Sequence, residues 1–543
     1  MMIAQPFSTM RERASKTVFS NCDAEELFTY SAQRWLWDEP AQLQRRYVRF
    51  NLDALVEIAE KAAGDDAVCV QVSKLPEGNF NKTFLAKMQD GKQLVVKIPN
   101  PNAGPGHYTT ASEVASMEYV RKLGIPVPKV LGYCSRPSES KLGAEYIVME
   151  KAPGVELGRR WDQLKARDKL SIVKQLAGIT CTLAQSRFPC YGSLYKRRDV
   201  APSESIPVDD EFAIGPTVGR AWFDDRRGEV DVPRGPWPSA DSVIKALVQR
   251  ETKCLETFPT FPRDRQQGIF SGPGGYHPSK EAKLSVLQDL IKVSPYLIPR
   301  GEALSAGMIW HNDLHTENIF IDNVDCRITS IIDWQGVPIY PMFLATHHPS
   351  LIDYEGPKPE GFVSPTLPDN LDTLDPEAKK AAKELFLCQS LWLSYEIEVQ
   401  RAVPNLLHTF RHRDTLPGQI LGITGSIYDD GEAYVQRLLT EVTKADVWKQ
   451  IVGEDNIPCP LHYSKQDMAK QQSEYAKWER DVEYKARVLD ALGVYTGWNG
   501  AVSPKDYDQM AQRLAVVKEQ FLARESANDQ ERALWEEVWP FRS

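Results

Sequence analysis

The segment that decides the fold runs from Met308 to Trp334 and reads MIWHNDLHTENIFIDNVDCRITSIIDW. It contains the pattern H-x-D-x-x-x-x-N at His311, Asp313 and Asn318, and Asp333 then ends an apolar run. In this spacing a loop carboxylate can accept the proton of an attacking hydroxyl, while an asparagine and a second carboxylate can hold magnesium against nucleotide phosphates. We therefore expect Asp313 to be a catalytic base and Asn318 and Asp333 to be magnesium ligands. His311 is expected to hold the loop by hydrogen bonding.

The residues upstream of this segment add a nucleotide-binding pattern. Lys97 lies in the third of three strand-like runs, where a phosphate-contacting lysine is expected, and Glu113 lies in the next helical run as its ion-pair partner. The loop between the first and second of these strand-like runs contains one glycine, and its backbone amides can still contact a phosphate. The order of these elements predicts ATP and Mg2+ as cofactors. The residues expected to bind nucleotide are Gly78, Asn79, Lys97, Glu113 and, near the adenine, Met149, Glu150 and Ala152.

The local patterns predict a strand-rich front and a helix-rich rear. Asp90-Gly91 is typical of a tight turn between two strands, and Ala152-Pro153-Gly154 interrupts the chain after the front part. Residues 196–238 are rich in proline, glycine and charge and are expected to be irregular. Strands are predicted over 68–75, 82–88, 93–98 and 145–150, with a further sheet-like patch at 308–332. Helices are predicted over 41–63, 111–123, 164–185, 375–400, 432–450, 465–491 and 505–538.

This order of elements predicts an α+β fold of two lobes. We expect a small N-lobe with an antiparallel sheet over 28–150, carrying the nucleotide loop, the lysine strand and the glutamate helix. A large, mainly helical C-lobe is expected over 151–500, carrying the catalytic loop 308–334 and a helical substrate region. Residues 501–543 are expected to form a C-terminal helical extension, and residues 1–27 a tail or a targeting segment.

Composition argues against several classes of protein. The chain has 65 basic and 74 acidic residues, a net charge of −9, whereas general binders of nucleic acid or anionic membranes are more often basic. Nine cysteines without a C-x-x-C pair argue against a zinc ribbon or a disulfide framework and favour an intracellular compartment. No apolar run approaches the roughly 18 residues that a membrane span needs. Residues 1–20 are similar to a mitochondrial transit peptide, which leaves mitochondrion and cytoplasm open.

With these motifs, the chain resembles the aminoglycoside-phosphotransferase-like kinases, and in particular the fungal branch that includes altered inheritance of mitochondria protein 9. The resemblance spans roughly residues 25 to 500. It implies that the α+β, two-lobed fold is a protein-kinase-like fold and that the protein is an ATP- and Mg-dependent phosphotransferase acting on a hydroxyl of a small molecule. The segments that carry the resemblance to the branch are FTYSAQRW (28–35), LPEGNFN (75–81), ASEVASM (111–117), GIPVPKV (124–130), GAEYIVME (143–150), RGPW (234–237) and IDWQ (332–335).

The sequence departs from the family pattern at several positions, and these departures keep two alternatives open. The nucleotide loop has one glycine rather than three, which leaves room for a non-catalytic nucleotide-binding or scaffold protein. Asn312 stands where bacterial drug-modifying members usually have glycine, which argues against an antibiotic substrate. Many protein kinases have an arginine at this position and an A-P-E motif further on. Both are missing here, so a protein kinase is the weaker alternative.

Overall fold

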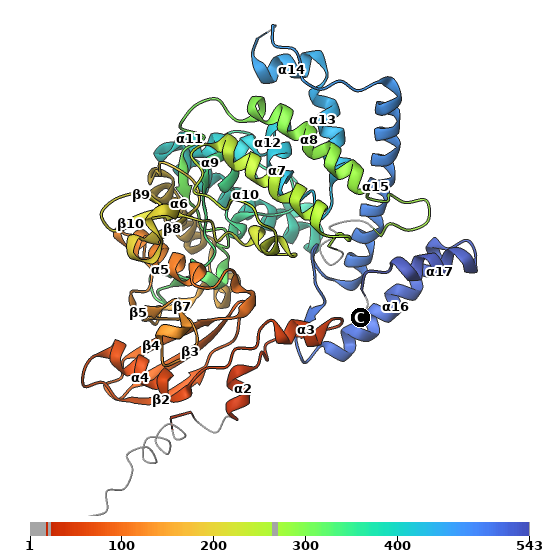
Figure 1. The fold of residues 1–543 in the computed structure, drawn as a ribbon. Helices are drawn as coiled ribbons and strands as arrows, with labels where there is room; N and C mark the ends of the chain where they lie inside the picture. The colour runs from red at the N-terminus through yellow and green to blue at the C-terminus, as the bar shows by residue number, and fades with distance from the viewer. Residues whose placement is uncertain (1–17, 20–22, 263–269, 455, 542–543) are drawn as a thin grey trace, which may run out of the picture.

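The computed structural model describes residues 18–19, 23–262, 270–454 and 456–541, and the predicted targeting segment falls largely outside them. Figure 1 shows a smaller lobe of strands, in red and orange, next to a larger lobe that is mainly helical. The last helices, in blue, run along one side of both lobes. This arrangement is the predicted α+β, two-lobed fold.

The smaller lobe is built on one antiparallel sheet with the strand order β2-β3-β4-β6-β5. Its elements are α4 (Leu52–Ala63), β2 (Cys69–Lys74), β3 (Asn81–Met88), β4 (Gln93–Pro99), α5 (Tyr108–Lys122), β5 (Val130–Cys134) and β6 (Tyr146–Glu150). Leu55 of α4 lies in one apolar cluster with Phe84 of β3, whereas Val114 of α5 lies in another with Ile147 of β6. Successive residues of a strand point to opposite faces of the sheet, so the two clusters lie on its two faces. Helix α4 therefore covers one face and α5 the other. Gly91, in the tight turn between β3 and β4, has a φ of +90°, which favours glycine.

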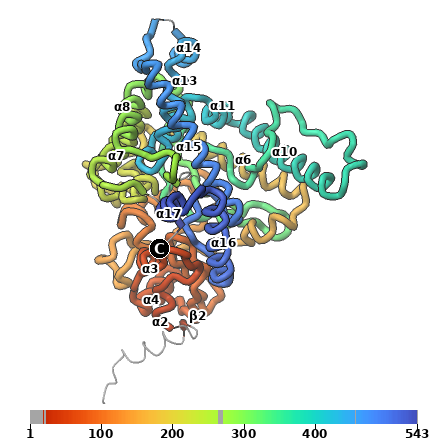
Figure 2. Tube along the Cα trace, turned by 90° about the vertical axis from the view of Figure 1, so that its right-hand side faces the viewer, coloured from red at the N-terminus to blue at the C-terminus, as the bar shows by residue number. Residues whose placement is uncertain are grey.

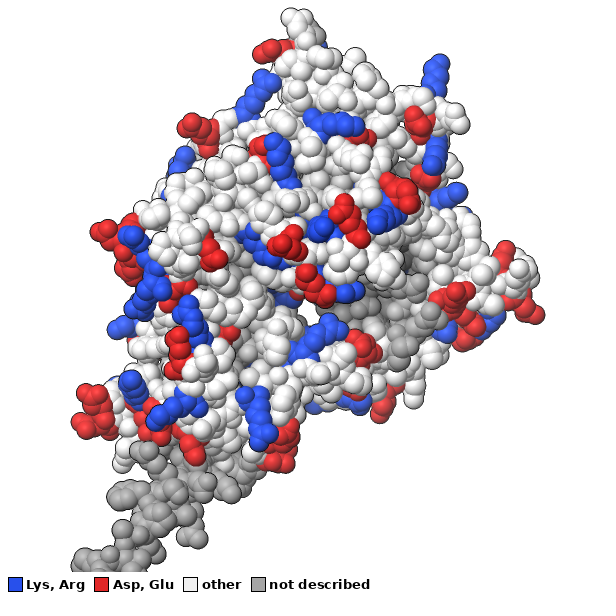
Figure 3. All heavy atoms as spheres, in the orientation of Figure 1, with Lys and Arg blue, Asp and Glu red and all other residues white. Residues whose placement is uncertain are grey.

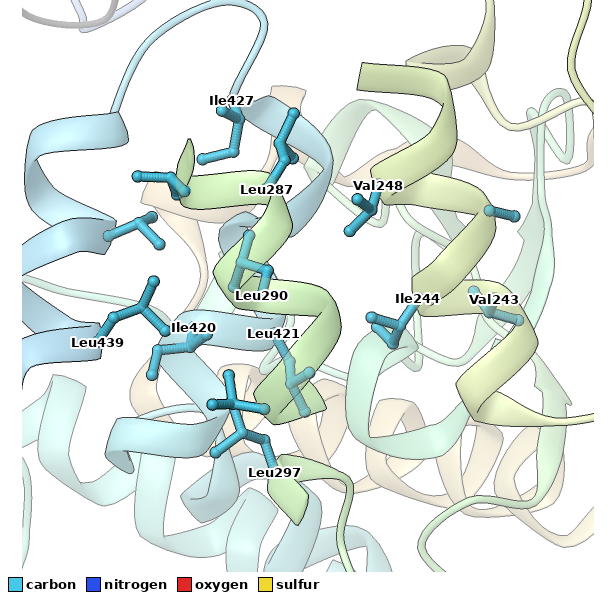
Figure 4. Packing of buried hydrophobic residues seen from close by; sticks show 14 of the residues in the cluster. Val243, Ile244, Val248, Leu287, Leu290, Leu297, Ile420, Leu421, Ile427 and Leu439 are labelled. Carbon is cyan, nitrogen blue, oxygen red and sulfur yellow. The ribbon is translucent and has the colours of Figure 1, made fainter. Parts of the chain in front are cut away.

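The larger lobe is a set of packed helices with several small sheets, two of which flank the catalytic loop. Its helices include α6 (Ala166–Gln185), α7 (Ala240–Thr257), α8 (Lys280–Leu297), α9 (Met342–Ala345), α10 (Pro376–Ala402), α11 (Pro404–His412), α12 (Leu416–Ile423), α13 (Glu432–Val442) and α14 (Ala445–Val452). Figure 4 shows apolar side chains of α7, α8, α12 and α13 converging on a common core. The two sheets at the catalytic loop pair β11 (Gly307–Ile309) with β14 (Ile339–Pro341), and β12 (Ile319–Ile321) with β13 (Ile328–Ile331) and β7 (Val155–Glu156).

A segment near the N-terminus meets the C-terminal part of the described chain beside both lobes. The C-terminal part consists of α15 (Lys465–Leu492), β15 (Ala501–Val502), α16 (Tyr507–Glu525) and α17 (Asp529–Val538), which pass over the front of the view in Figure 2. Strand β1 (Arg34–Trp35) pairs antiparallel with β15. The guanidinium of Arg34 also lies 3.7 Å from the ring centre of Tyr507 in α16. An N-terminal arm and a C-terminal extension therefore hold each other.

Three helices that were predicted as continuous are each divided into two in the structure. The helix expected over 41–63 is divided into α3 (Glu39–Gln44) and α4, because Asn51 caps α4 by accepting a hydrogen bond from the Ala54 backbone amide at 3.2 Å. Between them the chain buries Arg46, whose guanidinium lies 4.4 Å from the ring centre of Trp35. The helix over 432–450 is divided into α13 and α14. The helix over 505–538 is divided into α16 and α17, where the Asn528 side chain caps α17.

The sequence patterns did not predict α7 and α8, which form the centre of the larger core. Ser239 and Ser279 cap these helices by accepting backbone hydrogen bonds at 3.2 and 3.1 Å, and a serine before an apolar-periodic run is a recognisable helix start. Residues 196–238 are mostly irregular, as predicted, but β10 (Phe212–Gly215) pairs with β8 (Ser193–Lys196) inside or next to this region.

A buried carboxylate on α15 makes stability depend on pH. Burial raises the pKa of Asp481 to about 6, although the Tyr276 backbone amide, Arg480 and His277 act in the opposite direction. Because the pKa of this group is raised on folding, its stabilising contribution is complete at low pH and is lost as the pH rises through about 6. Asp481→Asn should therefore raise the free energy of unfolding at pH 7.5 by about 2–3 kcal/mol.

The increase in the free energy of unfolding caused by Asp481→Asn should become smaller towards pH 4. Urea denaturation of both proteins over a pH series measures this difference. An asparagine oxygen can still accept the 3.1 Å hydrogen bond from the Tyr276 backbone amide. Asp490→Asn, at an exposed position of the same helix, is the matched control. If Asp481→Asn raised the free energy of unfolding by the same amount at pH 4 and pH 7.5, ionisation of Asp481 would not be what destabilises the wild type.

The visible surface carries no large patch of one charge. Figure 3 shows lysine and arginine side chains interspersed with aspartate and glutamate over the face that it presents. Among the helices that the structure describes, none combines the length and the apolar character that crossing a membrane requires.

Candidate active site

The site is organised around a buried ion-pair triad. Lys97 Nζ lies 2.5 Å from Glu113 Oε1 and 2.7 Å from Asp333 Oδ1. Lys97 comes from the central strand β4, Glu113 from α5, and Asp333 follows β13 in the other lobe. Burial lowers the pKa of Lys97, but the carboxylates of Asp333 and Glu113 outweigh it and raise that pKa well above its usual value. The lysine is therefore held as a cation at the boundary between the lobes.

Asp333 occupies an unusual backbone conformation. Its φ is +62°, in the left-handed region that residues other than glycine occupy at a cost. Burial raises the pKa of Asp333, but Lys97 outweighs burial and lowers that pKa below its usual value, so the side chain is a carboxylate. The local strain is thus located at the residue whose oxygen joins the two lobes.

His311 connects the catalytic loop to the strand that precedes Asp333. Its Nε2 lies 2.9 Å from the Ile332 carbonyl, and the Asp313 backbone amide donates to its Nδ1 at 3.3 Å. These partners require a neutral ring with the proton on Nε2. Burial lowers the pKa of His311, which agrees with the neutral form. Its ring also packs edge-on against Trp334, with 4.8 Å between ring centres.

Asn318 closes the same loop from its other end. Its side-chain Nδ2 donates to the backbone carbonyl of Asp313 at 2.8 Å, and its backbone carbonyl accepts from the backbone amide of Ile332 at 3.0 Å. Since the amide nitrogen is engaged by the loop, the side-chain oxygen is the atom available for a cation. His315 contributes here as well, with its Nε2 3.1 Å from Asn318 Nδ2 and 3.4 Å from Asp313 Oδ2.

The Asp313 side chain is 70% exposed, in contrast to the buried triad. Its backbone is fixed by His311 and Asn318 on either side, so the carboxylate projects from a rigid loop. A rigid, exposed carboxylate is suited to orient a hydroxyl that arrives from solvent.

The nucleotide loop between β2 and β3 is held by contacts within its own lobe. The backbone amide of Asn100 donates to the backbone carbonyl of Phe80 at 2.7 Å, and the side-chain Nδ2 of Asn102 donates to the backbone carbonyl of Asn79 at 3.2 Å. Glu77, at the start of the loop, is buried between Lys74 and Lys82 at 2.9 and 3.0 Å. A Cβ added at Gly78 would meet nothing within 4 Å, so the backbone there is open to a ligand.

The three residues expected near an adenine lie at the end of β6 and just after it. Met149 and Ala152 are buried, and Met149 belongs to the same apolar cluster as Val114 of α5. The Glu150 carboxylate accepts a hydrogen bond from the Lys129 backbone amide at 3.2 Å, which directs this side chain towards β5. The three residues therefore lie where the chain passes from the smaller lobe to the larger lobe.

Two side chains that sequence reasoning missed also reach the site. Gln335 exchanges two amide hydrogen bonds with Asn81, at 2.9 and 3.0 Å. Burial raises the pKa of Glu113, and Gln335 acts in the opposite direction. The guanidinium of Arg220 lies 3.4 Å from the ring centre of Phe80 in the nucleotide loop. Gln335 was detectable as a polar residue directly after I-D-W, but nothing in the local sequence of Arg220 marks its position.

The donor set of the site fits a nucleotide with a hard divalent cation. Asp333 and Asn318 offer oxygen atoms, which magnesium prefers to nitrogen or sulfur ligands. Lys97 provides a fixed positive charge on the same side, and the open backbone at Gly78 provides amide donors. The described residues therefore contain the groups that binding of a magnesium–nucleotide complex needs.

Comparison with known proteins shows which family the chain belongs to. The family model of the phosphotransferase enzyme family matches residues 71–343, from β2 to the start of α9. The chain belongs to this family. The match includes the triad, the catalytic loop and the nucleotide loop, and it ends before α10.

Several known proteins are similar to this chain over a longer stretch than the family model covers. A subtelomeric hrmA-associated cluster protein of Aspergillus fumigatus is 29% identical, over 87% of this chain and 97% of the relative. Altered inheritance of mitochondria protein 9, mitochondrial, of Yarrowia lipolytica is 22% identical, over 86% and 85% of the two chains. A solved structure of a putative aminoglycoside phosphotransferase from Ralstonia eutropha has 15% identity and a TM-score of 0.35, covering 72% of this chain and 99% of the other.

Proposed function

We propose that the protein transfers the γ-phosphate of ATP to a hydroxyl group of a small molecule, with Mg2+ as the metal. The observation that supports this proposal most strongly is the triad of Lys97, Glu113 and Asp333, with contacts of 2.5 and 2.7 Å across both lobes. A structural ion pair would not need a second carboxylate from the other lobe in a left-handed backbone conformation. Family membership supports phosphoryl transfer independently.

The proposed mechanism assigns one task to each side chain. Asp313 accepts the proton of the acceptor hydroxyl and directs its oxygen towards the terminal phosphate. Lys97, oriented by Glu113, contacts the phosphates, and the backbone around Gly78 and Asn79 covers them. When bound, magnesium neutralises charge that develops on the phosphate oxygens, and Asn318 and Asp333 are the residues that would hold it.

A non-catalytic nucleotide-binding protein is the second candidate. The observation that favours it is the loop at 77–81, which has a single glycine to approach the phosphates. Both candidates predict nucleotide binding, and only the first predicts phosphoryl transfer. Neither nucleic acid nor a membrane surface is part of either proposal.

We also propose a mitochondrial location. The supporting observations are the mitochondrial names of several relatives and the basic, Ser- and Thr-containing residues 1–20. Fractionation of cells that express a tagged full chain tests this point, and recovery in the cytosol alone would contradict it.

Nucleotide binding is tested first, because it does not require the acceptor to be known. Lys97→Ala should weaken the affinity for Mg-ATP by roughly ten- to a hundredfold, because it removes a charged hydrogen-bond donor worth about 1.5–3 kcal/mol. Isothermal titration calorimetry measures the two affinities, with circular dichroism to show that the variant is folded. Lys87→Ala, on an exposed position of β3, is the matched control. Equal affinities of wild type and Lys97→Ala would contradict the assignment of Lys97.

A further inference from the structure

The nucleotide loop touches the opposite lobe through two neighbouring residues, Phe80 and Asn81. The Arg220 guanidinium lies 3.4 Å from the Phe80 ring centre. Asn81 and Gln335 exchange two amide hydrogen bonds, at 3.0 and 2.9 Å. Both contacts join residues that are far apart in the sequence, and both cross from the N-lobe to the C-lobe. We call these four side chains the latch.

Arg220 is held firmly in the C-lobe. Its Nη2 donates to both carboxylate oxygens of Asp224, at 3.0 and 3.2 Å. It begins a short 3-10 helix whose last residue, Trp222, is fully buried. A Cβ at Gly336 would lie 3.5 Å from Arg220 Cγ, so the arginine stem passes close to the segment that follows Asp333. The guanidinium is thus a fixed platform on which the aromatic ring of the loop rests.

Gln335 joins three parts of the site through one side chain. It follows Asp333 by two residues, and it exchanges amide hydrogen bonds with Asn81 at the end of the nucleotide loop. Burial raises the pKa of Glu113, the partner of Lys97, and Gln335 acts in the opposite direction. Movement of the loop away from the C-lobe therefore breaks a contact of a side chain that lies beside the triad.

The contacts inside the N-lobe have a different role. The hydrogen bonds from Asn100 and Asn102 to the loop carbonyls connect residues of the same lobe. They tie the loop to the segment that follows β4, within the N-lobe. The latch, in contrast, joins the loop to the C-lobe.

We propose that the latch retains bound nucleotide, with Arg220 and Gln335 as positioning residues that hold the loop closed, so that ADP leaves only after both contacts have broken. This inference rests on the proposed use of ATP. It makes the release of product, rather than its formation, the step that these residues control.

The test is the dissociation rate of a fluorescent ADP analogue with magnesium, measured by stopped flow on the full chain. Arg220→Met and Gln335→Ala should each raise this rate by about tenfold, and the double variant by about the product of both factors. Phe80→Ala combined with Arg220→Met should release ADP no faster than either single variant, because both remove the same contact. Asn81→Ala probes the Gln335 contact from the other lobe if Gln335→Ala does not fold.

Arg226→Met is the matched control, because Arg226 stacks on Phe258 at 4.0 Å within the C-lobe and lies in the same region of the sequence. Its ADP dissociation rate should equal that of the wild type. Unchanged rates in Arg220→Met and Asn81→Ala, with a wild type that binds ADP, would overturn the latch and leave the proposed function intact. A wild type that binds neither ATP nor ADP would overturn both.

Discussion

Asp313→Asn is expected to lower phosphoryl transfer by 10²–10⁴-fold, the range typical of a general acid–base group, while folding and Mg-ATP affinity remain unchanged. The substitution keeps the size of the side chain and removes its charge. Because the carboxylate is 70% exposed and makes no contact with the triad, its loss should not disturb Lys97 or Asp333. Turnover of labelled ATP against a panel of hydroxylated metabolites measures the effect.

Glu317→Gln is the matched control for Asp313→Asn. Glu317 belongs to the same loop and its side chain is 71% exposed, so this change removes an equal charge at a distance of four residues. Its turnover should stay close to that of the wild type. A wild type that transfers phosphate to no acceptor, together with a folded Asp313→Asn protein that complements a deletion strain, would favour the non-catalytic candidate.

Asp333→Ala is expected to abolish turnover, and removal of divalent cations from the wild type should do the same. The change removes the carboxylate proposed to hold magnesium and also one of the two partners of Lys97. Addition of Mg2+ or Mn2+ should restore the wild type after chelation but should not restore the variant. Turnover assays across a metal titration distinguish these outcomes.

Asp333→Asn separates the chemical effect from a backbone effect. Asparagine tolerates the left-handed conformation at φ +62° better than alanine, so this variant should fold normally and still lose activity. Asp325→Asn, an exposed position in the adjacent hairpin, controls for the loss of a nearby negative charge. Full turnover of the wild type in chelated buffer would refute the magnesium assignment.

The sequence predicted the elements that depend on short-range patterns. β2, β3, β4 and β6 occur within a residue or two of their predicted bounds, as do α10 and α15. Alternation and helical periodicity act over a few residues, so they survive in the folded chain. The breaks before α4 and α17 were missed because each of these helices begins at a single capping side chain, Asn51 and Asn528 respectively.

The ion pair of Lys97 with Glu113 could be predicted from the order of the elements, and it is confirmed, but the contact of Lys97 with Asp333 could not be predicted. Lys97 and Glu113 are 16 residues apart, whereas Lys97 and Asp333 are 236 residues apart. Only packing of the lobes decides whether such distant residues touch. The same applies to Arg220, whose contact with Phe80 depends on an irregular region without periodicity. Roles that depend on bound ligands remain predictions for the experiments above.

The pairing of β1 with β15 has a consequence for biosynthesis. Arg34 and Trp35 leave the ribosome early, yet their strand partners are Val502 and Ala501. Chain synthesis proceeds at about 5–20 residues per second, so the N-terminal arm waits for tens of seconds before its partner strand exists. During that interval Trp37 lacks neighbours such as Trp498 and Phe541, with which it packs in the finished protein. The nascent chain therefore exposes an aromatic surface that chaperones can recognise, and a ribosome that stalls before residue 501 leaves that surface uncovered.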